Sequence, residues 1–278
     1  MPNGEGRDAP FGRYIEEKFG GRRLREVRAL RDRYRTMDAA ASLTALVPAI
    51  CGAANHIDQH LVLWRRLLGG VTPFSTFRGN FLEEVTLRLA RLASRSIAQE
   101  AAIRVVKLTT GEGIVAGVSL AFRHSDVPDP VPVVFRRDRE DVIVGLERTL
   151  SITAPDGAEI QFPHELVPIC VIACKMYVDA TRLENVLAKV KNLYAQYSTC
   201  RFMVVAEWDA LGGAWHDAGG RILDSLLAPL YQTVFLRGDT ARRPANAHLR
   251  RESLRNPYRA SALRRVYHAI RLALRTWQ

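Results

Sequence analysis

The chain has 278 residues, 47% of them hydrophobic, and a formal charge of +11. This length and hydrophobic content allow a full buried core and argue against intrinsic disorder, and the basic excess favours an acidic partner, most simply the phosphate backbone of DNA. A polar, glycine-rich start and the lack of a run of about twenty apolar residues predict a soluble, cytoplasmic protein without membrane contact. The cysteines show no zinc-type spacing, which fits a reducing compartment; they are Cys51, Cys170, Cys174 and Cys200.

Residues 1–78 are predicted to form an N-terminal helical region. Apolar residues such as Leu24, Val27 and Leu30 recur at helical spacing within residues 12–68, and Gly69-Gly70 is expected to end the helical pattern. Many arginines accompany this pattern, among them Arg22, Arg23, Arg25, Arg28, Arg31, Arg33 and Arg35. They are typical either of a solvated helix face or of phosphate contacts.

A further helix is expected from about residue 81 to residue 98, opened by Gly79-Asn80. Glu83 and Glu84 would lie in its first turn, where acidic side chains interact favourably with the helix dipole. Extended segments follow and are expected to form an antiparallel meander; they cover residues 103–108, 114–122, 131–135, 141–151 and 167–176.

The pattern then changes to helix, over about residues 181–197, with Thr181 and Glu184 spaced as a capping box. Residues 202–206 are continuously apolar and predict a buried strand. A strand, a helix of this length and a second buried strand favour a right-handed parallel crossover.

Residues 236–278 are predicted to form a basic helical tail. The segment from Arg237 to Gln278 holds eleven arginines and two acidic residues. An apolar stripe at helical spacing runs through it, made of Leu263, Val266, Tyr267, Ile270 and Leu274. The helix is expected either to dock by this stripe with its other face in solvent or to contact DNA; the one-sided charge favours DNA.

Two strand segments and one helix segment carry the strongest functional pattern. Residues 167–179 read Val-Pro-Ile-Cys-Val-Ile-Ala-Cys-Lys-Met-Tyr-Val-Asp, and side chains two apart on a strand share a face, so Ala173 and Lys175 point the same way. Residues 140–145, Glu-Asp-Val-Ile-Val-Gly, begin another apolar strand around Asp141. Residues 79–84, Gly-Asn-Phe-Leu-Glu-Glu, precede both.

In this order the segments resemble the PD-(D/E)XK nucleases, and among them the type II restriction endonucleases of the BbvCI kind, whose lysine strand reads like Ile-Glu-Cys-Lys-x-Tyr-x-Asp-x-Thr. The resemblance covers roughly residues 79–210. It implies an α/β fold with a restriction-endonuclease-like core, a mixed sheet flanked by helices, over residues 79–235, to which the N-terminal and C-terminal helical regions are added. It also implies an Mg²⁺-dependent phosphodiester hydrolase with Asp141 and the residue at position 173 as metal ligands, Lys175 as a catalytic residue and Glu83 as a helix acid, with Glu84 as its alternative.

Position 173 departs from the family pattern, because a methyl group cannot coordinate magnesium. The chain as given is therefore expected to be catalytically dead. Ala173 is interpreted as a deliberate substitution of the acid, which we favour, as the mark of a naturally disabled relative, or as a loss that another acid compensates. The candidate replacements are Glu165, Asp179 and Glu184.

Double-stranded DNA is the expected partner, bound by a homodimer or by a heterodimer with a related subunit, since one active site cuts one strand. The residues expected to bind DNA are Arg136, Arg137, Arg139, Arg242, Arg243, Arg250 and Arg251. The leading hypothesis is a sequence-specific restriction endonuclease. The alternatives are a structure-specific repair or recombination nuclease and a non-catalytic DNA-binding protein.

Overall fold

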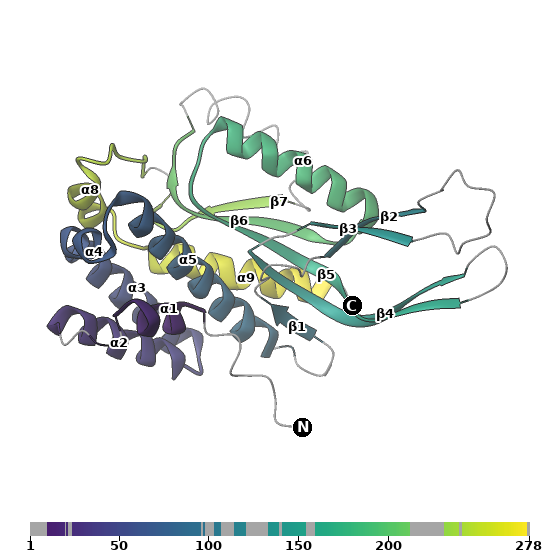
Figure 1. The fold of residues 1–278 in the computed structure, drawn as a ribbon, viewed down its shortest axis with the longest axis horizontal. Helices are drawn as coiled ribbons and strands as arrows, with labels where there is room; N and C mark the ends of the chain where they lie inside the picture. The colour runs from purple at the N-terminus through teal and green to yellow at the C-terminus, as the bar shows by residue number, and fades with distance from the viewer. Residues whose placement is uncertain are drawn as a thin grey trace.

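The first third of the chain is helical in the computed structural model (Figure 1). The structure describes residues 10–19, 21, 24–95, 97, 103–106, 114–120, 133–138, 141–153, 159–211, 231–238 and 241–276. The opening helices are α1 (Pro10–Phe19), α2 (Arg25–Asp38), α3 (Leu43–Gln59), α4 (Leu61–Leu68) and α5 (Val71–Arg95). Helix α4 ends at Gly69, whose positive φ of 85° is readily adopted only by glycine, so the predicted stop is confirmed.

Helix α5 begins earlier than the sequence indicated. It runs through Gly79 and Asn80 without a break, so the expectation that this pair opens the helix is wrong. Phe74, Phe77 and Phe81 are all buried and form a continuous helical stripe on both sides of Gly79. This packing overrides the low helix propensity of glycine, and it places Glu83 and Glu84 in the middle of the helix, away from its first turn.

A five-stranded mixed sheet lies at the centre of the molecule, in the order β1-β4-β5-β6-β7. Its strands are β1 (Ile103–Val106), β4 (Val142–Thr153), β5 (Glu159–Val178), β6 (Arg201–Asp209) and β7 (Tyr231–Phe235). Strands β2 (Ile114–Leu120) and β3 (Val133–Asp138) pair with each other and, among the described strands, with no other, as a separate two-stranded sheet. The expected simple meander is therefore wrong, because β1 pairs with β4 and the β2–β3 hairpin is inserted between them in the chain.

The predicted parallel crossover is confirmed. Strand β5 continues into α6 (Ala180–Gln196) and returns as β6, which pairs with β5 in parallel. The cap of α6 differs from the expected capping box: Asp179 is the N-cap, and its carboxylate accepts a hydrogen bond from the backbone N–H of Arg182 at 2.9 Å.

Helices cover both faces of the sheet (Figure 1). Helix α6 packs on one face through a smaller core that includes Ile143, Val171 and Ala173. On the other face, α5 and α9 (Ala260–Thr276) form a larger core together with the N-terminal helices, and α8 (Leu249–Arg255) packs against α3. The predicted stripe of α9 is buried, so this helix docks by one face. No helix in the described residues is long and apolar enough to cross a membrane.

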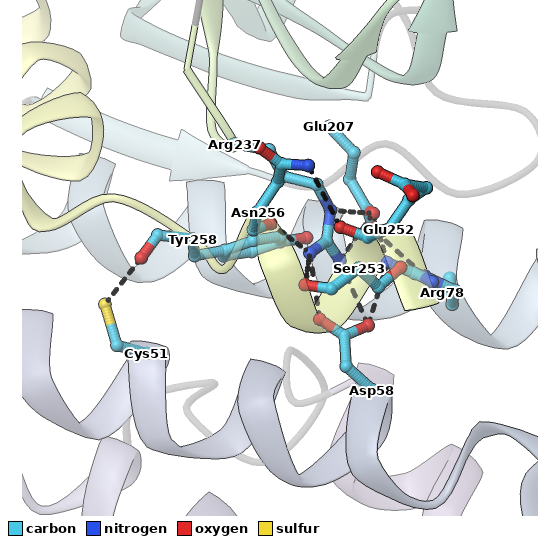
Figure 2. A network of polar contacts seen from close by, with 9 residues as sticks. All are labelled: Cys51, Asp58, Arg78, Glu207, Arg237, Glu252, Ser253, Asn256 and Tyr258. Atoms are coloured by element: carbon cyan, nitrogen blue, oxygen red, sulfur yellow. Dashed lines mark hydrogen bonds and ion pairs between the residues drawn. The ribbon is translucent and has the colours of Figure 1, made fainter. Parts of the chain in front are cut away.

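A buried network of four charged side chains ties the helices to the sheet (Figure 2). Arg237, which follows β7, donates to Asp58 of α3 at 2.9 Å and to Glu207 of β6 at 3.1 Å. Arg78 of α5 contacts the same two carboxylates, Asp58 at 3.3 Å and Glu207 at 3.2 Å. All four side chains are at most 3% exposed. Burial raises the pKa of Glu207, but Arg78 and Arg237 outweigh burial and hold this pKa below its ordinary value.

Replacing Arg237 by methionine is expected to lower the free energy of unfolding by about 3–5 kcal/mol, because the buried Asp58 and Glu207 would then share Arg78 as a counter-charge. The measurement is urea denaturation of both proteins. Arg275→Met, at an exposed position near the end of α9, is the matched control and is expected to change stability by about 0.5 kcal/mol or less. A loss below about 1 kcal/mol for Arg237→Met would show that the network is not a major source of stability.

Candidate active site

The two strands that carry the functional pattern are neighbours in the sheet. Strands β4 and β5 are antiparallel, with Val142 opposite Ile172 and Ile143 opposite Val171. Extending this register by one residue places Asp141, just before β4, directly opposite Ala173. Side chains of directly opposite residues on antiparallel strands lie on the same face, about 5 Å apart at their Cβ atoms.

Asp141 and Lys175 converge as expected. The Lys175 Nζ atom lies 3.2 Å from Asp141 Oδ2, and the backbone N–H of Cys174 donates to the same oxygen at 2.6 Å. The Asp141 side chain is 27% exposed and that of Lys175 is 33% exposed, so both groups reach solvent at this end of β5. The arrangement presents a carboxylate and an ammonium group together, accessible to a ligand, at the start of β4.

Ala173 is only 1% exposed and belongs to the core between the sheet and α6. None of the three acids considered as replacements lies in its place. Asp179 is the N-cap of α6 and is ion-paired with Arg182. Glu165 lies within β5, not before it as its sequence position had suggested, and is eight residues or about 26 Å of extended strand from Ala173. Glu184 is exposed on α6.

The two glutamates of α5 have different surroundings. Glu84 is fully buried, and its Oε1 atom lies 2.8 Å from Arg88 Nε and accepts a hydrogen bond from the Tyr34 hydroxyl. These contacts hold its carboxylate among the helices. Glu83 is half-buried, and its carboxylate contributes to raising the pKa of the Cys174 thiol. Glu83 therefore faces β5 near Cys174, whereas Glu84 is held by Arg88 and Tyr34.

The Cys174 side chain points to the opposite face of β5 from Lys175, toward α5, and the residue is half-buried. Burial, then the Asp141 carboxylate, and more weakly that of Glu83, raise its pKa well above the ordinary value, while the Thr86 hydroxyl and Lys175 lower it to a smaller extent. Its sulfur lies 3.4 Å from the Thr86 hydroxyl. A raised pKa disfavours the thiolate form, which is the reactive form of cysteine.

The donor set does not complete a magnesium site. Asp141 supplies one carboxylate, and its Oδ2 atom already accepts from Lys175 and Cys174. Within the described parts of the chain, no group of three or more His, Cys, Asp or Glu side chains is placed to hold a metal ion. Magnesium is usually bound through one or two carboxylates together with phosphate oxygens and water, and Ala173 adds no carboxylate to that of Asp141.

The arginines expected to bind DNA fall into three groups. Arg139 lies outside the described residues, and Arg136 and Arg137 lie on β3, where only the backbone is described. Arg242 is ion-paired with Asp209, and Arg243 stacks on Tyr177 with its guanidinium carbon 3.5 Å from the ring centroid. Arg250 and Arg251 are exposed on α8.

Comparison with solved structures gives a clear likeness of fold. No protein-family model matches the sequence, and no curated protein matches it. Among solved structures, the chain is similar to one described as the native BbvCI A2B2 tetramer at low resolution, with a TM-score of 0.59 and 9% sequence identity. The match covers 96% of this chain and 92% of that chain.

The fold is restriction-endonuclease-like. Because the likeness extends over nearly the whole chain, it includes the helices that precede and follow the mixed sheet as well as the sheet itself. The predicted fold class is confirmed. At this identity the likeness concerns the fold, whereas the roles of individual residues depend on the geometry described above.

The ion pair between Asp141 and Lys175 is expected to contribute little to stability, because partly exposed pairs contribute about 0–1 kcal/mol. Asp141→Asn and Lys175→Met should each change the free energy of unfolding by about 1 kcal/mol or less in urea denaturation. A loss above about 2 kcal/mol in Lys175→Met would show that the lysine is retained as a structural residue and would weaken its assignment to chemistry.

Proposed function

We propose that the chain is a type II restriction-type DNA endonuclease whose active centre consists of Asp141, position 173 and Lys175, and that the chain as given is inactive because position 173 is alanine. The observation that supports this most directly is the 3.2 Å contact between Asp141 and Lys175 across two antiparallel strands, with Ala173 opposite the aspartate. The restriction-endonuclease-like fold supports the same proposal.

Hydrolysis of a phosphodiester requires an activated water in line with the leaving oxygen and stabilisation of the charge that develops on the phosphate. Lys175 is suited to the second task, because its ammonium group is held at the site by Asp141 yet remains one-third exposed. Asp141 orients the lysine and presents a carboxylate beside the attacking water. A magnesium ion held by Asp141 and an acid at position 173 would supply the remaining chemistry, a lower pKa of the water and charge neutralisation at the phosphate.

The absence of an acid at position 173 explains why the proposed chemistry would fail in this chain. A glutamate there would stand opposite Asp141 and supply a second carboxylate for magnesium. With Ala173, Asp141 and the more distant Glu83 remain as acids near the site, and Asp141 is already neutralised by Lys175. The chain is therefore proposed to bind DNA without cutting it.

Double-stranded DNA is the proposed partner, supported by the charge of +11 and by exposed arginines on α8. The similar structure is described as an A2B2 tetramer, and we propose that this chain also works in an assembly of two copies or with a related subunit. Such an assembly brings one active centre to each strand of the duplex.

A non-catalytic DNA-binding protein is the second candidate, and the packing of Ala173 favours it. The Ala173 side chain is 1% exposed and packs in the core between the sheet and α6, as expected of a native alanine. In that case DNA binding would be independent of divalent cations, and an acid at position 173 would create no activity.

Restoring the acid separates these candidates. Ala173→Glu is expected to cleave DNA in the presence of Mg²⁺, as measured by digestion of a complex DNA library with mapping of the ends. Adding Lys175→Met to Ala173→Glu should lower the rate by about 10²–10³-fold, the usual effect of removing one electrostatic stabiliser. Branched duplexes are digested in parallel with linear ones, and cleavage of the branched substrates alone would identify a structure-specific nuclease.

Ala173→Gln is the matched control, because it has the volume of glutamate without the charge, and it should remain inactive. Thermal melting of both variants establishes that the larger side chain is accommodated beside α6. Folded Ala173→Glu protein that leaves linear and branched DNA uncut would contradict the endonuclease assignment and favour the non-catalytic candidate.

A further inference from the structure

The ring of Tyr177, near the end of β5, contacts two guanidinium groups. The Arg243 Cζ atom lies 3.5 Å from the ring centroid and the Arg182 Cζ atom lies 3.9 Å from it. One face of a ring has room for one planar group at such a distance, so the two guanidinium groups lie on opposite faces. We refer to Tyr177, Arg182 and Arg243 as the Tyr177 stack.

The arginines near Tyr177 differ in whether a carboxylate forms an ion pair with them. Arg182 is ion-paired with Asp179, and the neighbouring Arg242 is ion-paired with Asp209. Arg243 is exposed, and within the described part of the chain no carboxylate forms an ion pair with it. Its guanidinium edge is therefore available to an anion, while its flat face is held by the tyrosine.

The backbone fixes the position of Arg243. Its N–H donates to the carbonyl of Asp209 at 2.7 Å, and the Asp209 N–H donates to the carbonyl of Ala241 at 3.2 Å, so the segment is joined to the end of β6. A stacked, anchored arginine loses little freedom on binding and presents its donors in a fork that matches a phosphate group.

The Tyr177 stack lies next to the proposed active centre. Tyr177 and Lys175 are two residues apart on β5, on the same face and about 6.6 Å apart along the strand. Phosphates of one DNA strand recur about every 3.4 Å along the helix axis. A backbone that places one phosphate at Lys175 therefore brings another, one or two nucleotides away, to the Tyr177 stack.

On the basis of the proposed function, we infer that Arg243 binds a DNA phosphate one or two nucleotides from the bond to be cut, and that Tyr177 holds its guanidinium group in the orientation for this contact. Arg182, on the other face of the ring, positions the tyrosine. Since phosphate is common to all sequences, the contact adds affinity without base preference.

The test is binding of short fluorescent duplexes of unrelated sequence to the full-length chain, measured by anisotropy over a range of salt concentrations. Arg243→Gln should weaken binding about tenfold near 0.1 M salt, equally for every sequence, and reduce the slope of log K against log salt by about 1. Tyr177→Leu should weaken binding in the same direction, whereas Tyr177→Phe, which keeps the ring, should bind normally.

Arg35→Gln is the control for loss of one charge, since Arg35 is an exposed residue of α2, with its side chain 76% exposed. If Arg243→Gln and Arg35→Gln weaken binding equally, or if Tyr177→Phe is as weak as Tyr177→Leu, the inferred contact is wrong while the proposed function stands. If the unsubstituted chain binds no duplex at all, the proposed function falls and the inference with it. Melting curves establish that each variant is folded.

Discussion

The antiparallel pairing of β4 with β5 is the constraint on which the candidate site depends. A shift of one residue in this register would turn Asp141 away from Lys175, because successive side chains of a strand point to opposite faces. The register is held by buried apolar residues on both faces, such as Val142 and Ile143, and not by the polar site itself. Gly145 adds to it, since a Cβ atom there would lie 2.5 Å from the Val167 carbonyl oxygen.

Local periodicity was sufficient to predict the elements that surround the site. The alternation around Val171 and Lys175 indicated a strand, and the stripe from Leu263 to Leu274 indicated a helix; both are observed. The burial of this stripe shows that the helix docks by it, which the sequence had left open as the less favoured alternative to DNA contact. The start of α5 was not predictable in the same way. Glycine and asparagine are poor helix formers, and only the burial of Phe74, Phe77 and Phe81 against other elements decides that the helix continues through them.

The candidate site was predictable where its residues follow one another along a strand, and not where they meet through space. Asp141 and Lys175 were found from the order of two short motifs, and their contact follows from pairing of neighbouring strands. The separation of Glu83 from Glu84 depends on the direction in which each side chain leaves α5. The stacking of Arg243 on Tyr177 joins segments 66 residues apart and leaves no signal in either segment.

The buried network between Asp58, Arg78, Glu207 and Arg237 also limits which fragments of the chain can fold alone. Residues 79–235, the predicted limits of the nuclease core, contain Glu207 but neither of its two arginine partners, Arg78 and Arg237, so an isolated fragment with these limits would carry a buried carboxylate with no cation beside it. The helices on either side of residues 79–235 are therefore expected to unfold together with the sheet. Fusions that preserve this network are best placed at the ends of the chain, away from the four charged side chains.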